Sequence, residues 1–416
     1  MNNKFPIGFW NYPSLEMTEL SDVDDWADCG MTLIMSPQFN HETSDKQKML
    51  ALLDRCHERN LDVIVCDSRA KWKGASTDEE AYRKGYREAY ADFGNHPAVV
   101  GFYVGDEPHK SDNEDVYAAC RIQLEEAPEK IPYLNLFPFY NVPDEFGHTD
   151  YAFGYKDYNE WIDDFIPKCK LSVLSYDRYT QMNEGKKGVY EYFEDLKIHY
   201  DLAKKLGIPM WTTLLCVGHF RYRMPSYEDL LWQFNTAVAS GCKGIMWFYF
   251  RQLDATVNYR RAPINMLGQR TNTYYDLAEV LNSFHAVYGN LFQELDLDEC
   301  YHVGESLGGY PLLRKGENDY VLKAEPVFDI SGILSFFKSK SGDKYIAVVN
   351  NSTKESGKIS LTLSGKIKEL RRIYINRNER DIIKYHHDEG FEVTKEGIVY
   401  SPWLAPGQMN LYRIVE

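Results

Sequence analysis

The 416-residue sequence lacks the features that mark several large classes of protein. Its apolar segments all fall short of the roughly 18 residues that a membrane-spanning helix needs, and its N-terminus has neither the basic nor the long apolar region of a signal peptide. Its 8 cysteines are spread singly, without C-x-x-C pairs or the spacing of a disulfide framework. These absences predict reduced, buried thiols in a soluble cytoplasmic protein, or in a secreted or periplasmic one if a signal peptide has been cleaved.

Positive charge is also scarce. The chain has 47 Lys and Arg against 62 Asp and Glu, a formal net charge of −15 at pH 7, and no Lys/Arg-rich run. Because such a chain repels nucleic acid and anionic membranes, we expect neither as a partner. The sequence leaves the oligomeric state open.

Strand-like apolar runs and amphipathic helical segments alternate along residues 1–292. The expected strands are 5–10, 31–36, 61–66, 99–104, 132–137, 171–176, 209–215 and 244–250. The expected helices are 16–29, 45–60, 77–93, 112–126, 156–166, 189–206, 226–240 and 272–289. An open doubly wound sheet would need a glycine-rich phosphate turn, which is missing, so this alternation predicts a (β/α)8 barrel.

The helical period disappears after residue 292. Short strands separated by turns are expected at 320–325, 332–338, 344–350, 357–363, 370–375 and 409–415. This pattern predicts an α/β barrel domain over residues 1–292, followed by a smaller all-β sandwich domain over residues 293–416. The second domain has no concentrated set of Asp, Glu and His, so we expect it to be an accessory domain.

Two adjacent acids, Asp106 and Glu107, follow the apolar run 99–104 directly and precede Pro108. In a (β/α)8 barrel the C-terminal ends of the strands form the reactive face. A strand that runs into Asp-Glu-Pro therefore indicates catalysis, although a solvated turn is the plain alternative.

The ends of the other expected strands carry further carboxylates and rings. The candidate substrate contacts are Trp10, Asp67, Asn135, Tyr179, His219, Trp247 and Tyr249. Tyr12, Arg69 and Tyr140 also follow strands, and Asp177 ends the sixth. Each candidate has a plain alternative: Asp67 could pair with Arg69, Asp177 could hold a cation, and the rings could be barrel packing.

The sequence shows no other catalytic machinery. It contains no H-E-x-x-H or comparable metal site, no G-x-S-x-G elbow and no phosphate loop, so we expect no metal and no cofactor. What remains is a set of carboxylates among aromatic residues, which make up 14% of the chain. The commonest use of such a set is the hydrolysis of glycosidic bonds by two acids.

The segments "VVGFYVGDEP", "YLNLFPFY", "LSYDRY" and "GCKGIMWFYF" resemble the clan A glycoside hydrolases over the whole barrel. The resemblance implies an oligosaccharide or glycoside substrate with a β-linkage, and Glu107 as general acid/base. It also implies that Trp247 forms the floor of the sugar subsite.

One departure from that family leaves the second acid open. Clan A enzymes carry a nucleophilic Glu at the end of strand seven, whereas "MWTTLLCVGHF" has no acid, and Glu228 fits the first turn of the next helix. Asp177 could be the partner of Glu107. Alternatively, Asp106 and Glu107 could act on a substrate with its own 2-acetamido nucleophile, as in hexosaminidases. Thirdly, the site could bind glycans without cleaving them.

Overall fold

The computed structural model describes residues 4–139, 155, 157–183, 188–255, 258–383, 390–395 and 397–416. The fold is a (β/α)8 barrel followed by an all-β sandwich, as predicted. Contacts divide the chain into two compact units. Unit 1 comprises Met1–Arg178, Asp201–Phe220 and Gly244–Thr271, and unit 2 comprises Tyr179–Tyr200, Arg221–Lys243 and Asn272–Glu416. The domain boundary between residues 292 and 293 stays a prediction.

Among its described residues, unit 1 contains eight parallel barrel strands in the order β1-β9-β7-β6-β5-β4-β3-β2. They are β1 (Ile7–Phe9), β2 (Leu33–Met35), β3 (Asp62–Val65), β4 (Val99–Asp106), β5 (Ile131–Leu136), β6 (Leu174–Asp177), β7 (Met210–Leu215) and β9 (Gly244–Phe248). The two end strands also meet, because the N–H of Thr32 donates to the O of Ile7 at 2.8 Å. Each run predicted as a barrel strand overlaps one of these eight, so those predictions are confirmed.

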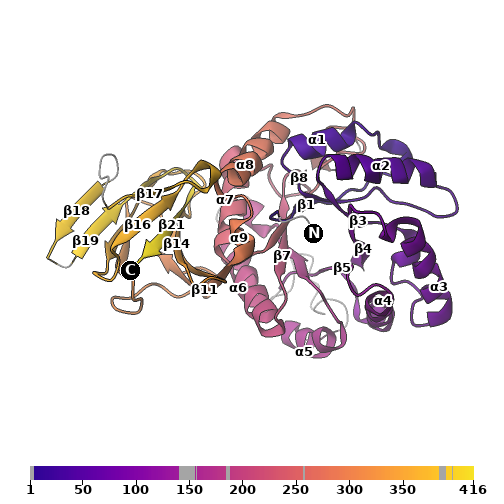
Figure 1. The fold of residues 1–416 in the computed structure, drawn as a ribbon, viewed down its shortest axis with the longest axis horizontal. Coiled ribbons are helices and arrows are strands. Elements are labelled where there is room, and N and C mark those ends of the chain that lie inside the picture. The colour runs from indigo at the N-terminus through magenta and orange to yellow at the C-terminus, as the bar shows by residue number, and fades with distance from the viewer. Residues whose placement is uncertain are drawn as a thin grey trace. The chain divides into compact units, whose positions relative to one another are not determined.

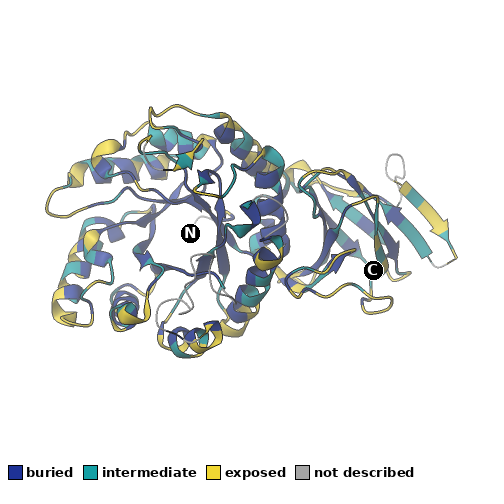
Figure 2. Cartoon of the chain, turned by 180° about the vertical axis from the view of Figure 1, so that it is seen from behind, coloured by how far each residue is buried: buried dark blue, intermediate teal, exposed yellow. Residues whose placement is uncertain are grey.

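The strand sequences are apolar on both faces, and nearly all of their residues are buried (Figure 2). Parallel strands covered on both sides need such continuous apolar runs. Figure 1 shows these strands as an inner ring with helices α1 to α5 outside it.

The described helices confirm the predicted helical segments. In unit 1 they are α1 (Asp22–Asp28), α2 (Lys46–Glu58), α3 (Glu79–Ala89), α4 (Asn113–Glu126) and α5 (Tyr158–Lys168). Helix α6 (Val189–Leu206) belongs to both units, and α7 (Tyr227–Ala239), α8 (Asn272–Tyr288) and α9 (Leu291–Glu294) belong to unit 2. Short helical turns are η1 (Leu15–Met17), η2 (Ser68–Ala70), η3 (Tyr90–Gly94), η4 (Lys110–Asp112), η5 (Thr180–Met182) and η6 (Ile375–Arg377).

Side chains at the helix starts explain where several helices begin. Asp45, Asp78 and Asp157 each accept a backbone N–H at the start of α2, α3 and α5. Ser226 and Asp229 form a capping box at the start of α7. Glu228 lies in the first turn of α7, as predicted.

The described part of unit 2 contains two antiparallel sheets. One has the strand order β11-β13-β14-β21-β16-β17. The other has the order β12-β15-β19-β18, and β20 also pairs with β15. The predicted strands correspond to β12 (Val321–Val327), β13 (Gly332–Ser339), β14 (Lys344–Asn350), β15 (Gly357–Leu363), β16 (Glu369–Ile373) and β21 (Met409–Val415). Their core includes Leu334, Val348, Leu361 and Tyr412.

The prediction missed five strands of unit 2. They are β11 (Leu295–Val303), β17 (Glu379–Asp381), β18 (Gly390–Thr394), β19 (Gly397–Ser401) and β20 (Trp403–Leu404). Strand β11 begins with alternating Leu and Asp, but a register shift between Leu297 and Glu299 interrupts this period. The others are short or largely exposed, so their sequences show little of the apolar pattern that buried strands have.

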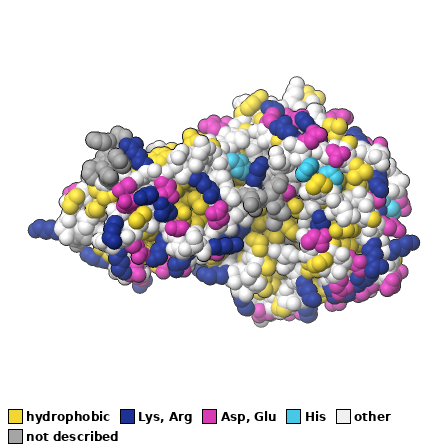
Figure 3. All heavy atoms as spheres, in the orientation of Figure 1, with side chains coloured by type: hydrophobic (Ala, Val, Ile, Leu, Met, Phe, Trp, Pro, Cys, Tyr) yellow, Lys and Arg dark blue, Asp and Glu magenta, His cyan; other side chains and the backbone are white. Residues whose placement is uncertain are grey.

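On the face drawn in Figure 3, acidic and basic side chains are interspersed. No helix in the described ranges combines the length and the apolar composition that crossing a bilayer requires.

Candidate active site

The pairing of β4, β5 and β6 brings polar residues into one row at the C-terminal edge of the barrel. Asp106 is opposite Asn135, and Asn135 is opposite Ser175. Asp177 lies two residues beyond Ser175 and therefore points to the same side of the sheet. We call Asp106, Glu107 and Asp177 the carboxyl cluster.

Asn135 connects two members of the carboxyl cluster. Its Nδ2 donates to Oδ1 of Asp106 at 3.1 Å and to Oδ1 of Asp177 at 3.0 Å. Its Oδ1 accepts from Oγ of Ser175 at 2.9 Å. The amide predicted to contact a substrate is thus buried and bonded to protein groups, so it positions carboxylates.

Glu107 has an unusual backbone conformation. Its φ is +46°, in the left-handed region that non-glycine residues seldom occupy. Its N–H donates to the O of Asn135 at 3.0 Å, which holds the turn after β4 in place. The Glu107 carboxyl hydrogen-bonds to Asp177. Two carboxyls can share a hydrogen bond only if one of them carries a proton.

The surroundings favour a protonated carboxyl. Burial, then the negative charges of Asp177 and Asp106, and the hydrogen bond to Asp177, raise the pKa of Glu107. Burial and then Asp177 raise the pKa of Asp106, while the hydrogen bond from Asn135 opposes that rise. Among the residues that the structure describes, no Lys or Arg contributes to either shift. The cluster therefore retains a proton at neutral pH, which is what a general acid requires.

The Trp72 ring lies directly against Gly105, the residue before Asp106, a position that the sequence did not reveal. A Cβ on Gly105 would lie 1.9 Å from Cζ3 of the Trp72 ring, so only glycine permits this approach. The N–H of Trp72 also donates to the O of Val104 at 3.1 Å.

Tyr12 is the most exposed of the rings at the ends of β1 and β9, with 38% of its surface accessible. Its ring centroid lies 4.9 Å from that of Tyr249 and 6.2 Å from that of Trp10. Tyr249 and Trp10 are buried, and Trp247 is 0% exposed. In this structure Tyr249 and Trp10 therefore pack against Tyr12, and the Trp247 ring has no face open to a sugar.

Two members of the carboxyl cluster act electrostatically on Tyr12. Burial and then the charges of Asp106, Tyr259 and Asp177 raise the pKa of its hydroxyl, so Tyr12 keeps its proton. An exposed ring with a protonated hydroxyl therefore adjoins the acids, and such a ring suits the apolar face of a sugar.

His219 lies on a two-stranded ribbon formed by β8 (Gly218–His219) and β10 (Tyr259–Arg260). Its ring stacks on Tyr259 with centroids 5.0 Å apart and an interplanar angle of 8°. Burial and the nearby Arg260 lower the pKa of His219 to about 4, so the imidazole is neutral at neutral pH. Within the described ranges, no group of three His, Cys, Asp or Glu residues has the arrangement of a metal site.

Asp67 stands apart from the carboxyl cluster in its contacts. It is fully buried, and its carboxylate accepts from Nε of Arg69 at 3.1 Å and from Nη2 at 2.7 Å. Arg69 also pairs with Asp92 at 2.9 Å. The predicted substrate contact is thus a buried ion pair, which was the plain alternative for this residue.

Tyr179 and Tyr140 are the remaining strand-end residues. Tyr179 belongs to unit 2, where its ring centroid lies 6.1 Å from that of Tyr222. Tyr140 lies outside the described residues.

The end of β7 carries no acid, and its neighbour β6 supplies one. Asp177 is opposite Thr213 of β7, whose Oγ1 accepts from Nε1 of Trp10 at 3.3 Å. Asp177 thus lies on the strand next to the one whose end carries the acid in the clan A family.

No family model matches this sequence, and no curated protein is detectably similar to it. Solved structures with a similar fold include a family 39 glycoside hydrolase from Bacteroides cellulosilyticus WH2, with a TM-score of 0.55, 10% identity, and coverage of 100% of this chain and 82% of that one. Another is a family 5 glycoside hydrolase from Bacteroides vulgatus ATCC 8482, with a TM-score of 0.56, 12% identity, and coverage of 99% and 89%.

A β-galactosidase from Marinomonas ef1 is also similar, with a TM-score of 0.50 and 14% identity. The similarity covers 68% of this chain but only 60% of that one, so this chain spans less than two thirds of that enzyme. At 10–14% identity these similarities show the fold, a barrel of the type found in clan A glycoside hydrolases, and nothing finer.

Proposed function

We propose that this protein is a glycoside hydrolase in which Glu107 is the general acid/base and Asp177 is its partner. The observation that carries the proposal is the hydrogen bond between these two carboxyls at the ends of neighbouring barrel strands. Similar folds in solved glycoside hydrolases support the reaction class.

Glu107 is the acid because its surroundings favour the protonated form. Burial and two neighbouring acids raise its pKa, so it holds a proton that it can donate to the glycosidic oxygen. Its backbone N–H donates to β5, so the backbone position from which the side chain extends is fixed.

Asp177 is the better candidate for the partner. It hydrogen-bonds directly to Glu107, and its charge raises the pKa of Glu107 more than the charge of Asp106 does. A direct hydrogen bond leaves no room for the water that separates the carboxyls of inverting enzymes, about 6.5–9.5 Å apart. The contact is closer to the spacing of about 5–5.5 Å in retaining enzymes, so we propose that Asp177 attacks the anomeric carbon.

The proposed reaction proceeds in two steps. Asp177 forms a bond to the anomeric carbon as the glycosidic C–O bond breaks, and Glu107 gives its proton to the leaving oxygen. The Glu107 carboxylate then takes a proton from water, whose oxygen attacks the same carbon and releases Asp177. The anomer released first, observed by proton NMR, tests this assignment, because an inverted product excludes it.

The substrate proposed is a β-linked glycoside whose sugar lies against Tyr12. The exposed ring next to the acids supports a saccharide substrate. Its identity is open to a screen of chromogenic glycosides that includes N-acetylated ones. The predicted cytoplasmic location and the accessory role of the sandwich also remain proposals.

Glu107→Gln is the direct test. The substitution keeps the shape of the side chain and removes its transferable proton, and loss of a general acid/base lowers turnover by about 10²- to 10⁴-fold. Glu114→Gln, an exposed Glu in the first turn of α4, is the matched control and should keep full activity. Unchanged turnover in Glu107→Gln would refute the assignment. An unbroken oligosaccharide bound by the wild type would instead indicate a glycan-binding protein.

A further inference from the structure

A chain of buried hydrogen bonds leads from the barrel interior to the carboxyl cluster. The hydroxyl of Tyr133 lies 3.1 Å from Oγ of Ser175, and Oγ of Ser175 donates to Oδ1 of Asn135 at 2.9 Å. All three side chains are buried. The amide of Asn135 then donates to Asp106 and Asp177, as described above.

The direction of these bonds is fixed by the number of protons. Ser175 has one hydroxyl proton, and it is used on Asn135, so Ser175 must accept the proton of Tyr133. Burial raises the pKa of the Tyr133 hydroxyl, so this proton stays in place. Every donor in the chain thus points towards the carboxyl cluster.

The Asn135 amide meets the acids with its nitrogen end. With Oδ1 held by Ser175, both N–H groups face Asp106 and Asp177. If the amide turned over, its oxygen would face two carboxyls and both donors would be lost. Donors to a carboxylate stabilise the ionised form.

We propose that Ser175 and Tyr133 are positioning residues which, through Asn135, keep Asp106 and Asp177 ionised and leave the proton of the cluster on Glu107. The proposal rests on the proposed function, because it specifies how one acid among three becomes the proton donor. Neither residue needs to touch a substrate.

Among the described residues, three tyrosines interact with the charges of the cluster. They are Tyr12 after β1, Tyr103 on β4 and Tyr133 on β5. Burial first, and then acids of the cluster, raise the pKa of Tyr12 and Tyr103, so these hydroxyls stay protonated through the neutral range. A pH profile near neutrality therefore reports on the carboxyls.

Tyr133→Phe and Ser175→Ala test the proposal. Tyr133→Phe removes one hydroxyl and keeps the ring, and Ser175→Ala removes the bond that orients Asn135. Tyr86→Phe, which removes the hydroxyl of a fully buried Tyr on α3, is the matched control. Activity is measured with the 4-nitrophenyl glycoside that the wild type cleaves fastest.

We expect kcat/KM to fall about tenfold or more in Ser175→Ala, and less in Tyr133→Phe, with KM nearly unchanged. The acid limb of the pH profile should also move to higher pH, because Asp177 protonates more easily without its donor. The alkaline limb should not move to lower pH, because Asp177 is ionised both before and after Glu107 loses its proton there. A merely structural role would lower activity without moving the acid limb.

A second measurement needs no substrate. The carboxyl carbon of Asp177, observed by 13C NMR in Asp-labelled protein and assigned with Asp177→Asn, should titrate at higher pH in both variants than in the wild type. An unchanged titration of Asp177 in both variants, as in Tyr86→Phe, would overturn the proposal. If the titration shifts but no glycoside is cleaved, the positioning role stands and the proposed function fails.

Discussion

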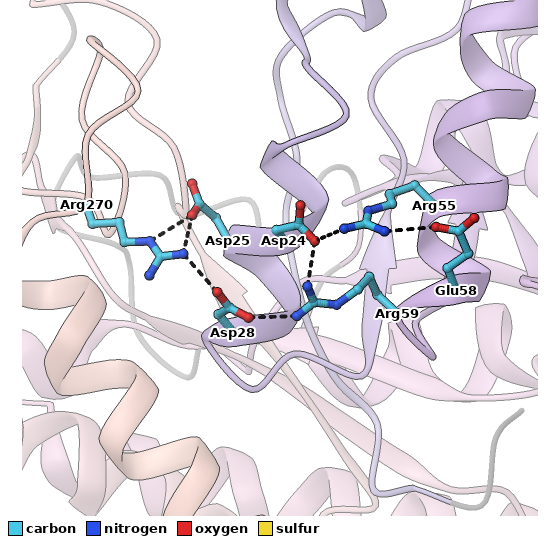
Figure 4. Close-up of polar contacts among 7 residues, drawn as sticks. All are labelled: Asp24, Asp25, Asp28, Arg55, Glu58, Arg59 and Arg270. Carbon is cyan, nitrogen blue, oxygen red and sulfur yellow. Dashed lines mark hydrogen bonds and ion pairs between the residues drawn. The ribbon is translucent and has the colours of Figure 1, made fainter.

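Unit 1 holds two groups of acids that differ in what neutralises them. On the outer surface, Asp24, Asp25, Asp28 and Glu58 alternate with Arg55, Arg59 and Arg270, a set that we call the surface ion-pair network (Figure 4). Asp28, for example, lies 2.7 Å from Arg59 and 3.1 Å from Arg270. The carboxyl cluster instead has neighbouring acids and the amide of Asn135.

This difference reverses the direction of the pKa shifts. The hydrogen bond from Arg59 lowers the pKa of Asp28, burial opposes this shift, and Arg270 adds to the lowering. Burial and two acids raise the pKa of Glu107. An acid next to arginines stays ionised and links helices, whereas an acid next to other acids keeps a proton that it can transfer.

Burial alone does not decide between these two behaviours. Asp67 is more deeply buried than either Asp106 or Glu107, yet Arg69 neutralises it through two side-chain hydrogen bonds. The neighbouring charge therefore decides whether a strand-end acid serves structure or chemistry.

We expect the largest effect on kcat/KM when the acids of the carboxyl cluster are replaced one at a time. Asp177→Asn should lower kcat/KM by about 10²- to 10⁴-fold, comparably to Glu107→Gln, because it removes the proposed nucleophile. Asp106→Asn should cost less, since Asp106 is bonded to Asn135 and stays outside the bond between Glu107 and Asp177. Steady-state kinetics on the cleaved glycoside measure both.

The reverse order would support the substrate-assisted alternative. In that case Asp106→Asn is the more damaging change, and only substrates with a 2-acetamido group react. Asp54→Asn, at an exposed position of α2, is the control for a neutral Asp-to-Asn change.

The sequence predicted the barrel and two of its acids for a physical reason. Parallel strands end at one edge, so Glu107 and Asp177 could be placed together from their positions after apolar runs alone. The eight strands were recognisable because each is buried on both faces. The short or exposed strands that were missed in unit 2 carry no such pattern, and in β11 a register shift interrupts it.

The sequence could not predict the direction in which individual side chains point. Asp67 and Asp177 look alike, since each ends a strand and an Arg follows closely. Arg69 folds back onto Asp67, whereas Nη1 of Arg178 donates to the O of Phe139. Ser175 was missed because a small polar residue inside a strand gives no sign of its cross-strand partner. That partner, Asn135, depends on the register between β5 and β6.

The buried pair Asp67–Arg69 offers the next test of the comparison. Arg69→Met removes the cation and leaves a buried carboxylate without its partner, which should lower the free energy of unfolding by about 3–5 kcal/mol. Adding Asp67→Asn should restore part of that loss, because the uncompensated charge is then gone. Urea unfolding measures both. A Michaelis constant that rises in Asp67→Asn alone would instead indicate a substrate contact.

The stability of the carboxyl cluster should depend on pH in the opposite sense to that of an ion pair. Glu107 has a folded-state pKa above its ordinary value of 4.5, so the folded protein binds this proton more tightly. Its contribution to stability is fully present below pH 4.5 and is lost as the pH rises towards the raised pKa.

Glu107→Gln does not titrate, so it should become more stable than the wild type as the pH rises above 4.5. We expect a difference of about 1 kcal/mol or more at neutral pH, which corresponds to about one pKa unit. Thermal unfolding at a series of pH values measures it. A constant difference between the two proteins at every pH would show that the proton is not retained on Glu107.

The surface ion-pair network should give the smallest effect. Arg270→Ala removes the bonds to Asp25 and Asp28, but all three side chains are partly exposed, so solvent screens their interaction. We expect a loss of less than about 1 kcal/mol in unfolding free energy and no change in kcat/KM. The loss should shrink further in about 1 M salt, where the screening length falls to about 3 Å. A loss of several kcal/mol that salt does not reduce would contradict this expectation. These exposed pairs would then be as strongly coupled as the buried pair Asp67–Arg69, and solvent exposure would not explain the difference between them.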